Sequence, residues 1–411
     1  METQLEPLVL DPSGADIHGE VVRMRARGPV TPVELPGGVR AWAINSAAAL
    51  RKVLASPLVS RNPRLHWPAF INGEITPEWS LFPSVSLTGM LTAYGKDHRR
   101  LRKLVAPAFT QQRTAALRPW IEEITTAMLD ELAAAPDTEP VDIRERYAYP
   151  VPLGVITELM GVPESFRPAL RNLVARSFDT SLTAEQSRTN FAELCELIAE
   201  LIAYRRAHPG EDMTSLLIAH RDEEETSLTE QELMDTLILV IGAGHETTVN
   251  LLDQAIFTLL ANPGQRADLM DGRVSVSWSD LMEETLRFQA PVAHLPLRFA
   301  VQDLEVEGVW IGKGDAILPS FAAANLDPEV YGDTAGEFDA SRKNKSHMAF
   351  GHGAHHCLGA SLARLEAGVA LPAIFERFPR MRLAVPAEEL RHLPSFMSNG
   401  HHELPVYLNG S

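Results

Sequence analysis

Hydrophobic residues recur at helical spacing through the middle of the chain, from about Tyr94 to about Gln289. Shorter segments with strand-like patterns flank this region on both sides. They are Val39–Ser46, Glu305–Ser320 (a hairpin pattern with a Gly-Lys-Gly turn) and Glu403–Leu408. The pattern therefore predicts a mainly α protein with a minor β portion. Because no flexible linker divides the chain, we expect one domain over residues 1–411.

The longest uninterrupted helical segment starts at a capping-box pattern, Ser227-Leu-Thr-Glu230, and meets no proline before Pro263. We expect a helix of about thirty residues, roughly 50 Å long. Its middle, Leu237–Gly244, is apolar on every side, which indicates a buried helix. Gly242 and Gly244 each cost about 1 kcal/mol relative to alanine in a helix interior. Their presence indicates close approach by a flat or bulky group.

Glu246 and Thr247 place a carboxylate and a hydroxyl directly after these glycines, in an otherwise apolar stretch. An unpaired polar group is penalised in such surroundings, so the pair needs an explanation. Helix packing at the glycines with a solvated groove at the glutamate is one interpretation. A proton relay beside a buried reactive centre is the other, and the residues alone leave both open.

The composition narrows the class of protein. Hydrophobic residues make up 45% of the chain, and the net charge is −17, which argues against nucleic acid or an anionic membrane as the main partner. Two cysteines cannot build a disulfide framework, which fits a reducing compartment. The first twenty residues lack the features of a signal peptide, and no apolar run is long enough to span a membrane. We expect a cytoplasmic protein in which Cys195 packs as a small apolar residue.

The other cysteine, Cys357, lies in the run FGHGAHHCLG, Phe350–Gly359. A zinc site using His352, His355, His356 and Cys357 fails on spacing, because the last two are adjacent and no second ligand pair lies at zinc-like distance. Spacing does not exclude a nucleophilic cysteine.

A third interpretation uses the helix expected directly after Cys357. Gly351 and Gly353 allow a tight turn, and Gly359 lets the helix begin at once. A buried helical stripe follows, formed by Leu358, Leu362, Leu365 and Val369. The thiolate would then lie at the positive end of this helix, as suits an axial ligand of haem iron. Further along, Pro372 predicts a kink or an early end of the same helix.

FGHGAHHCLG also matches the haem-thiolate signature F-x-x-G-x-[R/H]-x-C-x-G, and the chain resembles a bacterial cytochrome P450 over nearly its whole length. AGHETT (Ala243–Thr248) resembles the oxygen-activation segment, with Glu246 and Thr247 as its acid–alcohol pair; the acid is Glu where Asp is common in the family. Glu284 and Arg287 resemble the E-x-x-R pair. Alone they would be an ordinary helix-surface pair worth at most about 0.5 kcal/mol. The resemblance makes them a buried structural network with Arg342.

The resemblance implies the P450 fold, a haem b cofactor and Cys357 as the iron ligand. Residues expected to bind the cofactor are His98, Arg102, Ala243, Gly244, Thr247, Arg298, Phe350, Gly351, His355, Cys357 and Gly359, with His98, Arg102, Arg298 and His355 at the propionates. Residues expected to line the substrate pocket are Leu239, Ala243, Val292, Ala293, His294, Leu295, Phe396 and Met397, with Gln289 and His294 as polar orienting groups.

The activity implied is monooxygenation of a hydrophobic small molecule, a steroid ahead of a macrolide-type polyketide. Glu246 and Thr247 would deliver protons, and electrons would come from a ferredoxin with its own reductase, since no flavin domain follows the cysteine. Arg99, Arg100 and Lys103 are candidates for docking this acidic partner, or form a solvated basic face. We expect a monomer without a membrane anchor. The alternative function is a haem-thiolate sensor or electron carrier that does not hydroxylate.

Overall fold

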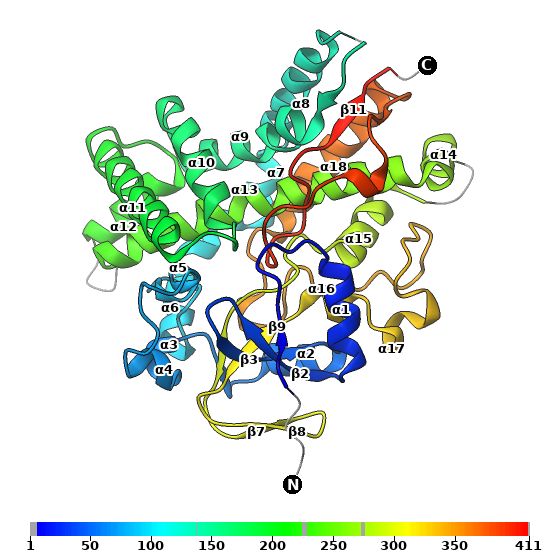
Figure 1. The fold of residues 1–411 in the computed structure, drawn as a ribbon. Coiled ribbons are helices and arrows are strands. Elements are labelled where there is room, and N and C mark those ends of the chain that lie inside the picture. The colour runs from blue at the N-terminus through cyan, green and yellow to red at the C-terminus, as the bar shows by residue number, and fades with distance from the viewer. Residues whose placement is uncertain (1–5, 137, 224–227, 273–275, 410–411) are drawn as a thin grey trace.

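Helix α13 (Glu230–Ala261) crosses the molecule, and the other elements are arranged around it (Figure 1). The computed structural model describes residues 6–136, 138–223, 228–272 and 276–409. The predicted long helix is confirmed, at 32 residues. Its capping box is formed by Thr229 and Glu232. The capping box predicted from the sequence began two residues earlier, at Ser227, which lies outside the described residues. Nowhere in the described ranges is a helix both long and apolar enough to cross a membrane.

The helical region predicted for the middle of the chain is confirmed, apart from the short strand β5 (Val141–Asp142). Its elements besides α13 are α6 (Gly95–Val105), η1 (Ala106–Phe109), α7 (Gln111–Ala116), α8 (Arg118–Ala133), η2 (Arg144–Ala148, a π-helical turn), α9 (Pro150–Leu159), η3 (Glu164–Phe166), α10 (Arg167–Ser177), α11 (Ala184–Ala207), α12 (Met213–Glu223), α14 (Pro263–Asp271) and α15 (Trp278–Phe288). Helices α8 to α12 gather on one side of α13 (Figure 1).

The larger part of the β portion lies with the N-terminal helices on the other side of α13 (Figure 1). Its main sheet has the order β1-β2-β3-β9-β6-β4. The elements of this part are β1 (Leu8–Val9), α1 (Ile17–Ala26), β2 (Val30–Leu35), β3 (Val39–Ile44), α2 (Ala47–Ala55), β4 (Val59–Ser60), α3 (Pro63–His66), α4 (Pro68–Ile71), α5 (Phe82–Ser86), β6 (Arg298–Ala300), β9 (Ala316–Pro319), α16 (Phe321–Asn325), α17 (Pro328–Tyr331) and η4 (Gly332–Thr334). The strand predicted at Val39–Ser46 is confirmed as β3.

The hairpin predicted over Glu305–Ser320 forms with a different turn. Strands β7 (Leu304–Val306) and β8 (Val309–Ile311) pair through Glu307 and Gly308, which both have positive φ. Such a two-residue turn matches the twist of the strands it joins. The Gly-Lys-Gly segment instead leads into β9, which leaves the hairpin and inserts between β3 and β6. The predicted turn position was therefore wrong.

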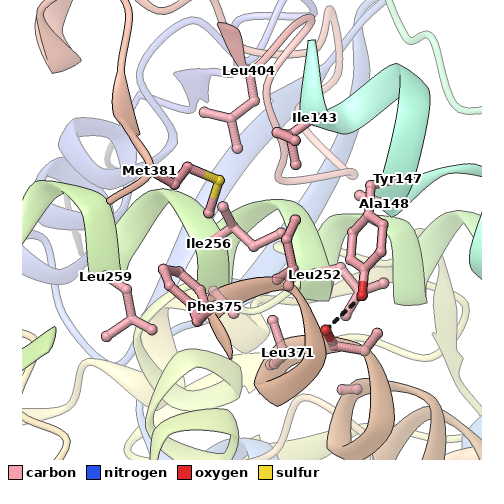
Figure 2. Packing of buried hydrophobic residues seen from close by; sticks show 14 of the residues in the cluster. Ile143, Tyr147, Ala148, Leu252, Ile256, Leu259, Leu371, Phe375, Met381 and Leu404 are labelled. Carbon is pink, nitrogen blue, oxygen red and sulfur yellow. Dashed lines mark hydrogen bonds between the residues drawn. The ribbon is translucent and has the colours of Figure 1, made fainter. Parts of the chain in front are cut away.

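The helix after the cysteine, α18 (Ala360–Arg377), packs against α8 and α13. Leu371 and Phe375 meet Leu252 and Ile256 in this core, and the Tyr147 hydroxyl donates a 2.6 Å hydrogen bond to the Ala370 carbonyl (Figure 2). Of the two alternatives predicted at Pro372, a kink or an early end of the helix, the early end is wrong, because the helix continues to Arg377. The chain closes through η6 (Ala387–Glu389) and a small sheet of β10 (Arg382–Leu383), β11 (Pro405–Tyr407, the predicted last strand) and β5.

Glu284, Arg287 and Arg342 are close together, as predicted. Arg287 Nη2 lies 2.7 Å and Arg342 Nε 3.2 Å from Glu284 Oε1, and both partners of the first pair are fully buried. Arg287 also donates to the carbonyls of Asn325, Ala335 and Glu337. This network therefore joins α15 to the long segment that precedes Cys357.

Replacing Arg287 by methionine should lower the free energy of unfolding by about 3–5 kcal/mol, because Glu284 would remain buried without its main cation. Urea unfolding at neutral pH measures the change. The matched control is Arg118→Met, which breaks an exposed ion pair with Glu122 and should cost less than about 1 kcal/mol. Equal losses in the two variants would contradict a structural role for the buried network.

Candidate cofactor-binding active site

The segment from Phe350 to Gly359 forms a tight loop that presents Cys357. Gly351 has a φ of 70°, and the Cys357 N–H donates a 2.8 Å hydrogen bond to the Phe350 carbonyl. A Cβ on Gly353, where the turn η5 (Gly353–His355) begins, would lie 2.5 Å from the Leu54 carbonyl oxygen of α2. The loop therefore needs glycine both for its backbone conformation and for its contact with α2.

The Cys357 sulfur lies at the start of α18, with Gly359 as the N-cap residue. Burial raises the pKa of the thiol, whereas the N–H groups of Gly359 and Ala360 and the guanidinium of Arg102 act to lower it. The residue nevertheless keeps exposed surface, and Arg102 donates a 2.7 Å hydrogen bond to the neighbouring His356 carbonyl. An accessible sulfur that faces backbone donors and a cation suits a thiolate that binds a metal.

One strip of α13 keeps accessible surface although the middle of this helix is otherwise buried. Ala243 is exposed, and Leu239 and Thr247, one turn before and after it, are half-buried. The Thr247 hydroxyl donates a 3.0 Å hydrogen bond to the Ala243 carbonyl. Leu358, next to Cys357, packs against the apolar cluster that contains Ile241 of α13. The strip therefore offers an apolar surface with one hydroxyl, on the helix that the cysteine loop adjoins.

The two glycines that flank Ala243 have different surroundings. A Cβ on Gly242 would have nothing within 4 Å, whereas a Cβ on Gly244 would lie 2.5 Å from Cδ1 of Ile156 in α9. We predicted that Gly244 contacts the cofactor, but the structure assigns its close approach to helix packing. Close packing of two helices requires a small residue at the crossing, which explains the glycine without a ligand.

Glu246 and Thr247 diverge although they are adjacent in sequence. Glu246 is 2% exposed and pairs with Arg144 of η2, with 3.0 Å between Oε1 and Nη2. Its Oε2 has no hydrogen-bond partner in the part of the chain that the structure describes. Sequence reasoning missed Arg144, because a lone arginine in a polar run such as Ile143-Arg-Glu-Arg146 carries no motif. The carboxylate is thus held on a different face of α13 from the hydroxyl.

Five basic side chains, which we call the cationic cluster, converge near the cysteine loop. Its members are Arg61, His98, Arg102, Arg298 and His355. The rings of His98 and His355 lie 4.0 Å apart. The buried Arg61 directly follows β4, and the buried Arg298 begins β6, the strand paired with β4. His98 Nε2, Arg61 Nε and Arg298 Nε have no hydrogen-bond partner among the described residues. Sequence reasoning missed Arg61, because only strand pairing places it beside Arg298.

The pKa values of the two histidines in this cluster are lowered by burial and by the neighbouring cations. Burial, Arg102, Arg298 and Arg61 lower the pKa of His98 to about 4. Burial and then Arg298 and Arg61 lower the pKa of His355 further still. In the described part of the chain, no member of the cluster forms an ion pair with a carboxylate. Buried charges are normally paired, so the cluster fits a dianionic group such as the two propionates of haem.

The residues predicted to line the substrate pocket separate into two groups. Val292 and Leu295 are half-buried, like Leu239 of α13. The other four, besides Ala243, are almost fully buried: Ala293, His294, Phe396 and Met397. Ala293, Phe396 and Met397 belong to the core cluster that contains Trp67 and Phe299, so their packing does not support a lining role. Gln289 is likewise engaged, by Asn399 and His18.

Comparison with known proteins gives a consistent picture. The cytochrome P450 family model matches residues 278–389. The 2-hydroxy-5-methyl-1-naphthoate 7-hydroxylase of Streptomyces carzinostaticus is 45% identical over 98% of this chain and 98% of its own. The structure of CYP154A1 from Streptomyces coelicolor A3(2) has a TM-score of 0.93 and 50% identity over 98% of this chain and 100% of its own. A steroid-bound CYP154C4 from Streptomyces sp. ATCC 11861 has a TM-score of 0.95 and 44% identity, over 98% and 99%.

Replacing Arg61 by methionine should have opposite effects with and without haem. Without haem, the lowered pKa of His98 makes stability fall as the pH drops from about 6.5 towards about 4, and removing one cation should reduce this fall. With haem bound, the loss of one charge-assisted contact should speed haem transfer to an acceptor protein about tenfold or more. Chemical denaturation of the cofactor-free protein and a haem-transfer assay measure the two effects.

The control is Arg40→Met, an exposed arginine on β3 that is outside the cluster. It should change neither the acid sensitivity nor the haem transfer rate. A slower or unchanged transfer rate in Arg61→Met would show that Arg61 does not hold the cofactor.

Proposed function

The chain belongs to the cytochrome P450 family of haem b monooxygenases, and on this premise we propose that it hydroxylates a hydrophobic fused-ring molecule, a steroid in the first place. Bound haem supplies the oxygen chemistry: one atom of O2 enters a C–H bond and the other leaves as water, with two electrons and two protons consumed. The observation that carries the proposal is the accessible strip of α13, where the Thr247 hydroxyl follows the apolar surface of Leu239 and Ala243.

The cofactor is held from two directions in this proposal. Cys357 binds the iron, and Phe350, Gly351 and Gly359 shape the loop that presents it. The propionates would lie among the members of the cationic cluster, in which Arg61 joins the four residues predicted from the sequence. The neutral state of His98 and His355 suits this role, because a neutral imidazole can donate a hydrogen bond without adding to the repulsion between the arginines.

Protons reach the reacting centre from Glu246 and Thr247 in this proposal. Thr247 lies on the accessible strip, where its hydroxyl can hold a water molecule. Glu246 is the acid, and it transfers protons through water because its carboxylate points to another face of α13. The two residues therefore act in sequence and do not touch each other.

The substrate class follows from the strip and from the relatives. Leu239, Ala243, Val292 and Leu295 offer an apolar surface without a charged group. The similar CYP154C4 holds a steroid, and the similar hydroxylase from S. carzinostaticus acts on a naphthoate, so both take flat fused rings. A binding screen by the haem absorption spectrum, with steroids, macrolides and naphthoates followed by product analysis, distinguishes a steroid from the alternatives.

The electron donor in this proposal is an acidic ferredoxin that docks beside the cysteine loop. Arg100 is unsuited to docking, because it pairs with Glu232 at the start of α13. A cleft of about 520 Å³ lies between α2 and α17, and its lining includes the basic residues Arg51, Lys52 and His352. Arg51 and Lys52 form no ion pair within the described ranges. In a protein of net charge −17, such a local basic surface steers an acidic partner to one place.

Replacing Thr247 by alanine should uncouple electron use from hydroxylation. The apolar surface stays, so substrate still binds, but the water that the hydroxyl holds is lost. Product formed per NAD(P)H consumed should fall about tenfold or more, and hydrogen peroxide should rise to account for the electrons. Chromatographic product analysis and a peroxide assay measure the two quantities together.

The control for this experiment is the carbon monoxide spectrum of the reduced protein. Thr247→Ala should keep the strongly red-shifted band of a thiolate-bound haem, whereas Cys357→Ser should lose it. An unchanged ratio of product to NAD(P)H in Thr247→Ala would remove this hydroxyl from proton delivery.

Reversing charge at Lys52 and Lys103 together should slow ferredoxin-dependent turnover at least tenfold at low salt, and the deficit should shrink as salt screens the contact. The carbon monoxide spectrum should be unchanged. Arg382→Glu is the control, since β10 and its partner β11 lie far from α2 (Figure 1). Equal rates and equal salt dependence in the double variant and the wild type would place the docking surface elsewhere.

A further inference from the structure

Arg144 lies at the centre of a buried polar cluster on the face of α13 that carries Glu246. Its Nη2 lies 3.0 Å from Glu246 Oε1, and its Nη1 lies 2.9 Å from Asn250 Oδ1 and 3.6 Å from Asp253 Oδ2. Asp253 is fully buried, and Arg144 and Glu246 nearly so. One guanidinium therefore lies between two buried carboxylates, and its position decides where the Glu246 carboxylate lies.

The loop from Ser395 to His402, which we call the C-terminal loop, binds the same groups. Ser398 Oγ accepts a 2.7 Å hydrogen bond from Asn250 Nδ2, and the His401 N–H donates a 2.8 Å bond to Asp253. At Gly400 the loop has no room for a side chain: a Cβ there would lie 2.4 Å from Asn250 Oδ1 and 3.0 Å from Arg144 Nη1. The loop backbone therefore lies directly against Asn250 and Arg144.

The other end of the C-terminal loop binds the segment that follows Arg287. The Ala293 N–H donates a 2.8 Å hydrogen bond to the Met397 carbonyl, and Val292 and Ser398 form an isolated β-bridge. Val292 belongs to the apolar surface assigned to the substrate. A continuous chain of hydrogen bonds therefore connects that surface, through the C-terminal loop, with Arg144 and Glu246.

A pocket borders the same cluster. A pocket of about 270 Å³ is lined by Arg144, Glu246 and Ser398, and also by Tyr149 and Arg171. Glu246 Oε2 is itself buried and has no hydrogen-bond partner among the described residues. The acid therefore borders a pocket that is separate from the apolar surface assigned to the substrate.

From this arrangement we propose that Arg144 is a positioning residue for Glu246, and that the C-terminal loop sets the position of Arg144. A substrate that displaces Val292 or the loop then moves the acid, so the share of electrons that ends in product depends on the fit of the substrate. This inference rests on the proposed function, in which Glu246 and Thr247 deliver protons. It adds Arg144 and Gly400 to the residues that control the reaction.

Gly400→Ala tests the contact without touching a group that binds or transfers anything. The φ of Gly400 lies outside the left-handed region, so alanine fits the backbone and the added methyl must displace Asn250 or Arg144. Product per NAD(P)H should fall at least threefold with a matching rise in peroxide, while the carbon monoxide spectrum stays unchanged. Gly336→Ala is the control, since a Cβ there has nothing within 4 Å, and it should match the wild type.

A second pair of variants gives a readout that needs no turnover. Arg144→Met leaves Glu246 buried without its cation, so the carboxyl should become neutral and add a protonated-acid carbonyl band to the infrared spectrum. The double variant Arg144→Met/Glu246→Gln should lack this band. Arg144→Lys keeps the charge, so it should show no band and should restore most of the coupling that methionine removes.

Wild-type coupling in Gly400→Ala, or no infrared difference between Arg144→Met and its double variant, would overturn the inference. Where Arg144→Met does not fold, the Gly400→Ala and Arg144→Lys measurements decide alone. Failure of the proposed function looks different, because Thr247→Ala would then also keep wild-type coupling. If Thr247→Ala uncouples and Gly400→Ala does not, the acid–alcohol pair stands and the role of the loop is wrong.

Discussion

Arg61, directly after β4, and Arg298, the first residue of β6, lie beside each other; both are buried, and neither pairs with a carboxylate of the described residues. Burial alone lowers the pKa of Arg61 to about 10, and burial and Arg61 lower that of Arg298 well below its ordinary value. Two histidines at the same place are held neutral. Such an arrangement is costly unless an anion enters it, so the rest of the site is built around a negative group that the protein itself does not supply.

The buried network of Glu284, Arg287 and Arg342 differs, because it contains its own negative charge. Glu284 accepts from Arg287 and Arg342, and the remaining guanidinium N–H groups donate to backbone carbonyls and to the Thr334 hydroxyl. This network is complete within the protein, so it stabilises the fold without a ligand. The contrast explains why the two arginine-containing clusters have different roles: one satisfies its own charges, and in the other three nitrogens have no hydrogen-bond partner among the described residues.

Two faces of helix α13 have different surroundings. One strip carries Leu239, Ala243 and Thr247 towards the surface assigned to cofactor and substrate. The face with Glu246 is bound to Arg144 and, through Asn250 and Asp253, to the C-terminal loop. Adjacent residues of a helix point about 100° apart, so the acid and the alcohol are separated even though the sequence places them side by side. In the proposed function, their cooperation therefore depends on water and on the residues that hold the acid in place.

What the sequence determined by itself is the set of features that local spacing encodes. Hydrophobic periodicity predicted the long helix and the helical middle of the chain, and the motif around Cys357 predicted a glycine turn followed by a helix. These predictions succeeded because backbone geometry depends on neighbours within a few residues. The register of the capping box and the turn of the β7–β8 hairpin were predicted less well, since several local solutions were available to the same residues.

Tertiary structure alone decided which distant side chains meet. Arg61 joins the cationic cluster through strand pairing, Arg144 reaches Glu246 across 102 positions of sequence, and Gly244 faces Ile156 where a ligand had been expected. For the same reason, Ala293 and Phe396 pack in the core cluster that contains Trp67 and Phe299. Burial and long-range pairing are properties of the assembled core, and no spacing pattern along the chain records them.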